Sequence, residues 1–221
     1  TVLEQLSRMR QGRSRRISSW DVSGRNRDCW TIEAGETKAL AEIEGPGVIR
    51  HIWFTIASDD PYYLRKNVLR IYWDGMDYPS VECPVGDFFG VGHSKVTSYS
   101  CAVMNMSANL ADEQHAAMNC YWPMPFATGA RVTVENQGAT PVRAWYFYVD
   151  HDLLDAPNPD DLRFHACIDA QAVHLGRRKG GDRPGGGHET LRGIFRAQAA
   201  FDGVAAHADL TLRARDLLAG G

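Results

Sequence analysis

Short stretches in which apolar and polar residues alternate follow one another between residues 37 and 149. Each stretch is rich in β-branched and aromatic residues, and Gly, Pro, Asn or Asp separates most of them. The pattern predicts β-strands over residues 37–43, 48–56, 68–73, 78–83, 96–104, 119–122, 131–136 and 143–149. About eight short strands with no long helix between them predict an all-β antiparallel fold, and a jelly-roll β-sandwich is the form that suits this number of strands.

Turn signals between these stretches favour the same fold. Gly45-Pro46-Gly47 is typical of a turn between two strands, and Asp74-Gly75 is typical of a β-hairpin. We expect the strand that begins at residue 119 to end before Pro123 and Pro125, because proline has no N–H group to donate to a sheet.

The two ends of the chain lack this alternation. Residues 1–19 are polar and rich in Arg, and three apolar residues at helical spacing favour one short helix there. Residues 176–187 contain no apolar side chain, so we expect a flexible segment, and residues 189–218 have apolar spacings that suit two short helices. The sequence therefore predicts an N-terminal segment (1–19), a jelly-roll domain (20–155) and a linker with an irregular or weakly helical C-terminal tail (156–221).

Composition divides the chain in the same way. All six Trp and all eight Tyr precede residue 149, whereas residues 161–221 contain ten of the 21 Gly, eleven Ala and no aromatic residue other than Phe. About 150 residues are enough to bury a core of their own. We therefore expect the aromatic-rich part to carry the fold.

Charge and cysteine content exclude several classes of function. The net charge is −3, with no basic excess, so we expect no nucleic-acid partner. No run of about 18 apolar residues is present and no apolar segment follows the start, so we expect no membrane span and no signal peptide. The five Cys are widely spaced and form no C-x-x-C motif, which favours free thiols and a cytoplasmic protein over a zinc site or a disulfide framework.

A polar loop before the first clear strand is the first candidate site, and it contains Trp20, Asp21, Asn26 and Asp28. An aromatic ring beside carboxylates and amides is the combination that binds a sugar, because the ring contacts the apolar face and the oxygens accept hydroxyl hydrogen bonds. The alternative is a loop that caps itself through its Asp and Asn side chains. The residue types leave both interpretations open.

The second candidate joins an acid to two aromatic residues, Asp87, Phe88 and Phe89, with His93 nearby. Here the alternative to substrate binding is a structural loop at a subunit interface. His51, His93 and His115 lack H-x-H spacing, so we expect no metal site and no cofactor.

Five segments resemble, in the same order, the domain of unknown function 2961 proteins, now grouped as glycoside hydrolase family 172. The similarity covers about residues 17–155. The segments are SSWDVSGRNRD (18–28), IEAGET (32–37) with IEGPGVIRHIW (43–53), PVGDFFG (84–90), NCYWPMPF (119–126) and VEN (134–136).

The resemblance implies two jelly rolls in tandem, of which this sequence would supply the first, and assembly into trimers or hexamers. It also implies retaining cleavage of furanosides, such as α-fructofuranosides, difructose anhydrides or arabinofuranosides. The catalytic residues of the family are two Glu in segments like GEGDD and GTGTEDYF, and neither segment occurs here. Retaining hydrolysis needs two carboxyl groups about 5–5.5 Å apart, yet Glu189 is the only Glu beyond residue 135.

The similarity ends after Cys167. The Ala-, Gly- and Arg-rich sequence that follows predicts either a frameshifted or truncated family member or a genuine, divergent tail. We therefore expect the N-terminal jelly-roll part of a retaining exo-glycosidase that acts on a furanoside or oligosaccharide and is inactive as this chain, with no catalytic residue of its own. The alternative is a non-catalytic carbohydrate-binding or oligomer-assembly module.

Overall fold

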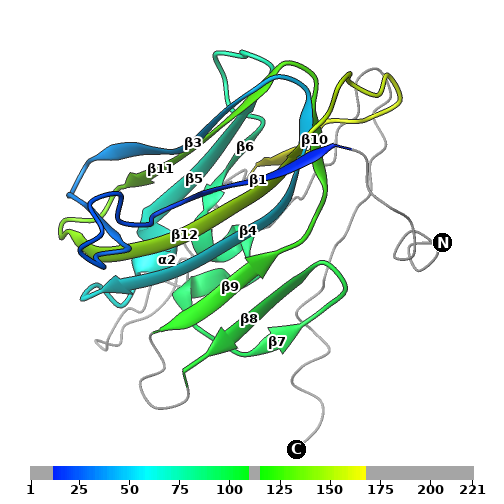
Figure 1. The fold of residues 1–221 in the computed structure, drawn as a ribbon. Helices are drawn as coiled ribbons and strands as arrows, with labels where there is room; N and C mark the ends of the chain where they lie inside the picture. The colour runs from blue at the N-terminus through cyan, green and yellow to red at the C-terminus, as the bar shows by residue number, and fades with distance from the viewer. Residues whose placement is uncertain (1–11, 110–114, 168–221) are drawn as a thin grey trace, which may run out of the picture.

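The computed structural model describes residues 12–109 and 115–167, which form two packed β-sheets (Figure 1). Sheet A contains, in spatial order, β1 (Arg13–Ser18), β12 (Val142–Leu153), β4 (Gly47–Ser58), β9 (Ala116–Cys120), β8 (Met104–Ala108) and β7 (Tyr99–Ser100); β2 (Trp30–Ile32) pairs with β12 and β10 (Met124–Phe126) with β4. Sheet B contains β13 (Ala166–Cys167), β6 (Val81–Pro84), β5 (Asn67–Trp73), β11 (Gly129–Asn136) and β3 (Thr37–Glu44). All pairings of the described strands are antiparallel except β13 with β6.

The chain passes repeatedly from one sheet to the other, as a jelly-roll sandwich requires. It crosses between β3 and β4, between β4 and β5, and on both sides of β11. The expected all-β sandwich is therefore confirmed. No helix within the described residues is long and apolar enough to cross a membrane.

The core lies between the sheets and is built from the inward-facing residue of each alternating pair. In β4, Phe54 is fully buried and meets the rings of Trp145 in β12 and Phe89 edge to face, with centroids 5.2 and 5.4 Å away. Burial of an apolar side chain of this size contributes roughly 1.5–3 kcal/mol relative to exposure. The apolar residues of the alternating pattern in the sequence are thus those that face the core, and the polar residues between them face solvent.

Three short helical turns, α2 (Tyr63–Lys66), α3 (Val85–Phe88) and η1 (Gly92–Ser94), pack together beside the core. Gly86 is required in α3, because a Cβ atom there would lie 2.8 Å from the Val91 carbonyl oxygen and 3.0 Å from the Leu64 Cβ. The PVGDFFG segment is therefore a close-packed connection that links sheet B to this helical cluster.

The structure corrects the prediction in sheet A. Strand β1 was not expected, because Arg13–Ser18 lacks apolar alternation; it forms because its backbone pairs with β12 along its whole length. The prediction of a single strand over 96–104 is wrong, because β7 and β8 form a hairpin. The Cys101 amide closes this hairpin by donating a hydrogen bond to the Met104 carbonyl (2.8 Å).

Two further boundaries in sheet A differ from the expectation. The strand expected at 119–122 is β9, and it runs from 116 to 120. Pro125 lies inside β10. Among the described strands β10 pairs only with β4, so the missing N–H group of Pro125 leaves no second neighbouring strand without a hydrogen-bond donor. The helices expected within residues 1–9 and 189–218 lie outside the described residues.

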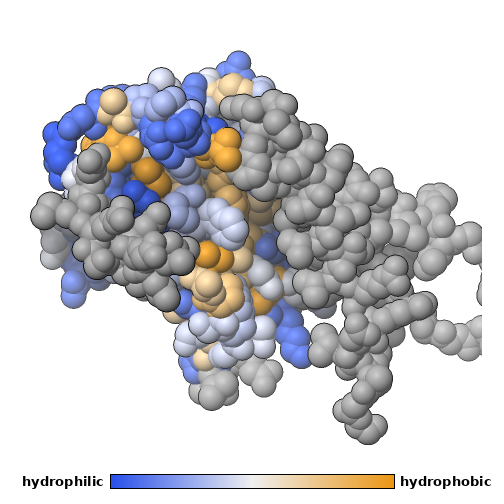
Figure 2. All heavy atoms as spheres, turned by 90° about the vertical axis from the view of Figure 1, so that its right-hand side faces the viewer, coloured by the Kyte–Doolittle hydropathy of each residue, from blue (hydrophilic) through white to orange (hydrophobic). Residues whose placement is uncertain are grey.

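Hydrophobic and hydrophilic residues are interspersed at the end of the molecule where β1 begins (Figure 2). Large hydrophobic side chains that remain exposed include Met76, Tyr78 and Trp122. Most of them lie on turns and connections, where the chain passes between strands.

Candidate functional site

The loop that joins β1 to β2 is built around the carboxylate of Asp21. Its Oδ1 accepts hydrogen bonds from the Ser23 amide (2.8 Å) and hydroxyl (2.6 Å), and its Oδ2 accepts from the amides of Arg25 and Arg27 (3.1 Å each). The Ser23 hydroxyl and these amides hold the pKa of Asp21 below its usual value. Asp28 adds a further cap, because its Oδ1 accepts the Asp21 amide (2.8 Å).

The other predicted residues of this loop have different surroundings. Trp20 is 61% exposed, so its ring is available to a ligand. Asn26 has a φ of 66°, a left-handed conformation that Asn tolerates better than most residues. The geometry thus supports the self-capping interpretation for both carboxylates and leaves Trp20 as the exposed ring; substrate binding by this loop stays a prediction.

The second candidate is held by the helical cluster. Asp87 in α3 forms an ion pair with Arg65 of α2, and its side chain is 2% exposed. Phe88 and Phe89 are buried and pack edge to face with a centroid distance of 5.0 Å. Both rings face the core in this arrangement, and their part in substrate binding stays a prediction. His93 lies in η1.

Sequence reasoning missed a hydrogen-bonded row on the outer face of sheet A. It takes one side chain from each of β1, β12, β4, β9 and β8, and we call it the sheet A ladder: Arg16, Asp150, His51, Asn119 and Asn105. Arg16 binds both carboxylate oxygens of Asp150 (2.5 and 2.9 Å). The ladder continues from Asp150 to His51 Nδ1 (3.0 Å), from His51 Nε2 to Asn119 (3.0 Å), and from Asn119 to Asn105 (2.9 Å).

The sheet A ladder lowers the pKa of its carboxylate, Asp150. Burial alone would raise the pKa of Asp150, but hydrogen bonds and charge from Arg16 and His51 outweigh burial and hold the pKa below its usual value. His51 is half-buried with both ring nitrogens engaged, as expected for a histidine on a strand. Within the described residues no group of three or more His, Cys, Asp or Glu is placed to hold a metal ion.

Aromatic rings flank the sheet A ladder. Trp53 and Tyr148 stack across β4 and β12 with centroids 4.6 Å apart, and the Arg16 guanidinium lies 4.2 Å from the centre of the Tyr148 ring. Tyr121 stacks on His51 at 4.6 Å and remains 46% exposed. The face therefore combines hydrogen-bonding groups with ring surface.

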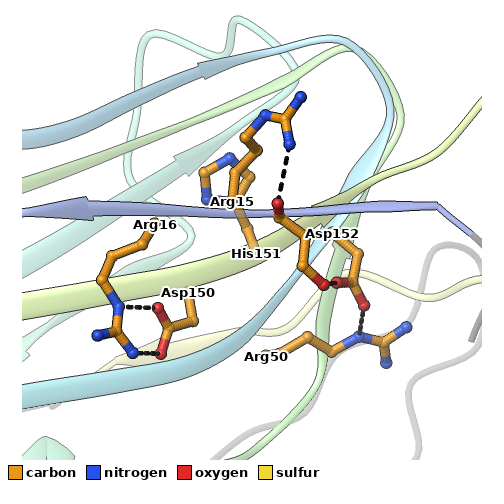
Figure 3. A pocket seen from close by; sticks show the side chains of 7 residues that line it. Arg15, Arg16, Arg50, Asp150, His151 and Asp152 are labelled. Carbon is orange, nitrogen blue, oxygen red and sulfur yellow. Dashed lines mark hydrogen bonds and ion pairs between the residues drawn. The ribbon is translucent and has the colours of Figure 1, made fainter.

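A hollow of about 420 Å³ adjoins the ladder at β1 and β12 (Figure 3). Asp152 lies at its edge, where it accepts hydrogen bonds from Arg50 (2.9 Å) and from the Ser14 hydroxyl (2.6 Å). His151 also lines the hollow but is buried, and burial lowers its pKa. The arrangement offers paired charges and the Ser14 hydroxyl to a polar ligand.

The sequence alone indicates only part of the sheet A ladder. Tyr146, Tyr148 and Asp150 alternate with buried residues, so one strand face could be read from the sequence. The partners on the neighbouring strands depend on the register, which sets His51 opposite Asp150 and Asn119 opposite Trp53. Spacing along the chain contains no information about that register.

Comparison with known proteins places the chain in a family. No curated protein matches it. A family model described as GH172 domain-like matches residues 25–147, which span the sandwich from the end of the β1–β2 loop to the middle of β12. Because this match covers more than half of the 221 residues, the chain belongs to the GH172 domain-like family, which relates it to glycoside hydrolases.

Proposed function

We propose that the sandwich is the N-terminal jelly-roll part of a retaining exo-glycosidase that acts on furanosides, and that this chain alone does not hydrolyse them. The observation that carries the proposal is the family match along the sandwich. Retaining cleavage requires two carboxyl groups about 5–5.5 Å apart. The segments that carry the glutamate pair in the family do not occur in these 221 residues, and beyond Glu135 the sequence contains only Glu189.

In this proposal the jelly roll contributes to substrate binding. Trp20 would stack on the sugar, since its ring is largely exposed, and the polar groups of its loop would meet hydroxyl groups at the rim. Asp87 would act from within the helical cluster, as a positioning residue through Arg65. The expected ligand is an α-fructofuranoside, a difructose anhydride or an arabinofuranoside, bound by a trimer or hexamer.

The test is to incubate the purified chain with an aryl arabinofuranoside and an aryl fructofuranoside and to measure the phenol released. We expect no release above the spontaneous rate. Enzyme-like turnover that survives further purification would contradict the proposal, because it would require a carboxyl pair of a different kind within this chain.

The alternative function is a non-catalytic carbohydrate-binding or assembly module. The self-capped β1–β2 loop favours the assembly role, because the hydrogen bonds of Asp21 are directed to the loop itself. Calorimetry with oligosaccharides and sizing of the purified chain separate the two functions. Sugar binding without hydrolysis by a monomer of the chain favours the module, because the proposed glycosidase binds its sugar as a trimer or hexamer. Trimer formation without sugar binding favours an assembly role.

A further inference from the structure

We propose that the outer face of sheet A binds a neutral oligosaccharide, at a surface separate from the β1–β2 loop. The inference rests on the proposed carbohydrate function and gives it a location. The surface consists of the sheet A ladder and the rings beside it, Trp53, Tyr121 and Tyr148.

The chemistry of the ladder suits a ligand rich in hydroxyl groups. Carboxylate, amide and guanidinium groups each have more donor or acceptor positions than the ladder uses. Asn105, for example, accepts one hydrogen bond from Asn119 through its oxygen, and its amide hydrogens can donate to a sugar oxygen. The mutual bonds hold these side chains in place, so little conformational entropy is lost when a ligand binds.

The charges on this face select against an ionic ligand. Arg16 is paired with Asp150, and Arg50 is paired with Asp152. The ladder therefore presents paired, opposite charges with no excess of either sign, and Arg15 adds one further cation at the hollow. A neutral ligand complements such a surface better than a phosphate or an acidic peptide.

Ring surface supplies the apolar part of the contact. Tyr121 is 46% exposed, and it lies on the same side of the sheet as the stacked rings of Trp53 and Tyr148. The C–H face of a sugar ring can cover them, because aromatic rings offer a large apolar surface with few rotatable bonds.

The dimensions of the face suit an extended ligand. The ladder crosses four inter-strand steps of about 4.8 Å, or roughly 19 Å in all. The hollow of about 420 Å³ at β1 and β12 lies at one end of this path. A short linear oligosaccharide can therefore contact several side chains of the sheet A ladder and place its terminal sugar unit in the hollow, whose volume suits a small ligand.

The experiment is isothermal calorimetry on the full chain with linear inulin oligosaccharides and linear arabinan oligosaccharides. Two variants remove rings from the face, Tyr121→Ala and Trp53→Ala. Tyr72→Ala is the matched control, because Tyr72 lies on the outer face of sheet B under Arg131 (4.0 Å). Trp20→Ala tests the β1–β2 loop, and circular dichroism checks that each variant folds.

We expect Tyr121→Ala to weaken binding of at least one oligosaccharide about fivefold to tenfold, and Trp53→Ala to weaken it further. Tyr72→Ala should leave the dissociation constant within about twofold. Because Tyr121 is 46% exposed and lies outside the core, its variant keeps the test valid even if Trp53→Ala does not fold.

Other outcomes overturn the inference and are distinguishable from failure of the proposed function. Loss of binding in Trp20→Ala alone would place the sugar at the loop, which leaves the proposed function standing. No binding of either oligosaccharide by the unaltered chain would remove the sheet A site. A change of oligomeric state in Trp53→Ala with intact sugar binding would identify the face as a contact between copies. Furanoside hydrolysis by the chain would contradict the proposed function without affecting the sheet A surface.

Discussion

The outer faces of the two sheets differ in how their polar side chains are arranged. On sheet B, Arg70 bridges Glu82 (2.8 Å) and Glu135 (2.7 Å), and Arg131 covers Tyr72. Glu82 is 48% exposed, whereas Arg70 and Glu135 are 18% and 26% exposed. On sheet A the corresponding row consists of one ion pair followed by histidine and two amides, flanked by stacked rings.

The difference indicates that the two faces serve different ends. Exposed ion pairs add little to stability and mainly keep a surface soluble. Partly buried amides and histidine have to be hydrogen-bonded, because an unpaired polar group there costs 1–3 kcal/mol. The outer face of sheet A meets this requirement along five strands and also carries Trp and Tyr rings. This composition is typical of a binding surface rather than of a solvated one.

The largest expected effect comes from removing the carboxylates that anchor each row. Asp150→Ala should lower the free energy of unfolding by roughly 2 kcal/mol, because Arg16 and His51 lose a charged acceptor. Glu135→Ala on sheet B should lower it by less than about 1 kcal/mol, because Arg70 keeps its ion pair with Glu82. Urea unfolding of both variants measures the difference, and equal losses would remove the distinction between the faces.

Acid should act on the same two carboxylates. The pKa of Asp150 is held below its usual value, as described above, and the pKa of Glu135 is lowered by the hydrogen bond from Arg70. A carboxyl whose pKa is lower in the folded state stabilises the fold above its unfolded pKa and loses that contribution as the pH falls through the folded pKa. Stability should therefore decline below about pH 4.

Neutral variants apportion that decline. In urea titrations between neutral pH and pH 3, Asp150→Asn should show a shallower loss of stability than the unaltered chain, with Glu135→Gln as the matched control on sheet B. Asp150→Asn should flatten the profile more, because Asp150 is hydrogen-bonded to two cationic or ionisable partners and Glu135 to one such partner, Arg70. A larger effect of Glu135→Gln would reverse the comparison.

A smaller effect is expected from the amide rungs. Asn119→Ala removes hydrogen bonds to His51 and Asn105, and should cost about 1 kcal/mol of unfolding free energy. Thr133→Val on sheet B is the contrasting variant, because the buried Thr133 hydroxyl has no hydrogen-bond partner within the described residues. Its replacement by a methyl group should be neutral or stabilising. Thermal unfolding of the two variants tests whether hydrogen bonding, rather than burial, distinguishes the rows.

The strands of the core could be predicted because their signal is local. Phe54 and Trp145 belong to runs in which every second residue is buried, and the same alternation is visible in the sequence. Strand β1 could not be predicted in this way, since Arg13–Ser18 becomes a strand through pairing with β12, about 130 residues away. Few side chains of a charged edge strand are buried, so its sequence shows little alternation of apolar and polar residues.

The candidate site shows the same limit. Trp20, Asp21, Asn26 and Asp28 were identified as a group from one loop, and in the structure Asp28 accepts a hydrogen bond from the Asp21 amide. Whether the carboxylates of such a loop face a ligand or their own backbone depends on dihedral angles that residue types do not determine. The sheet A ladder depends on the register of five strands, so it became visible only with the structure.

The smallest effect on stability should come from Trp20→Ala. The ring is 61% exposed, and removal of a largely exposed side chain away from the core usually changes the unfolding free energy by less than about 0.5 kcal/mol. The loop itself should keep its shape, because its hydrogen bonds converge on Asp21 and Asp28 and none of them uses the indole. Asp21→Ala is the companion variant: it removes the acceptor of those bonds and should loosen the loop, which hydrogen exchange of the Arg25 and Arg27 amides would report. If Trp20→Ala instead unfolds the chain at a clearly lower temperature, the indole is part of the packing, and its exposure could no longer be taken as a sign of ligand binding.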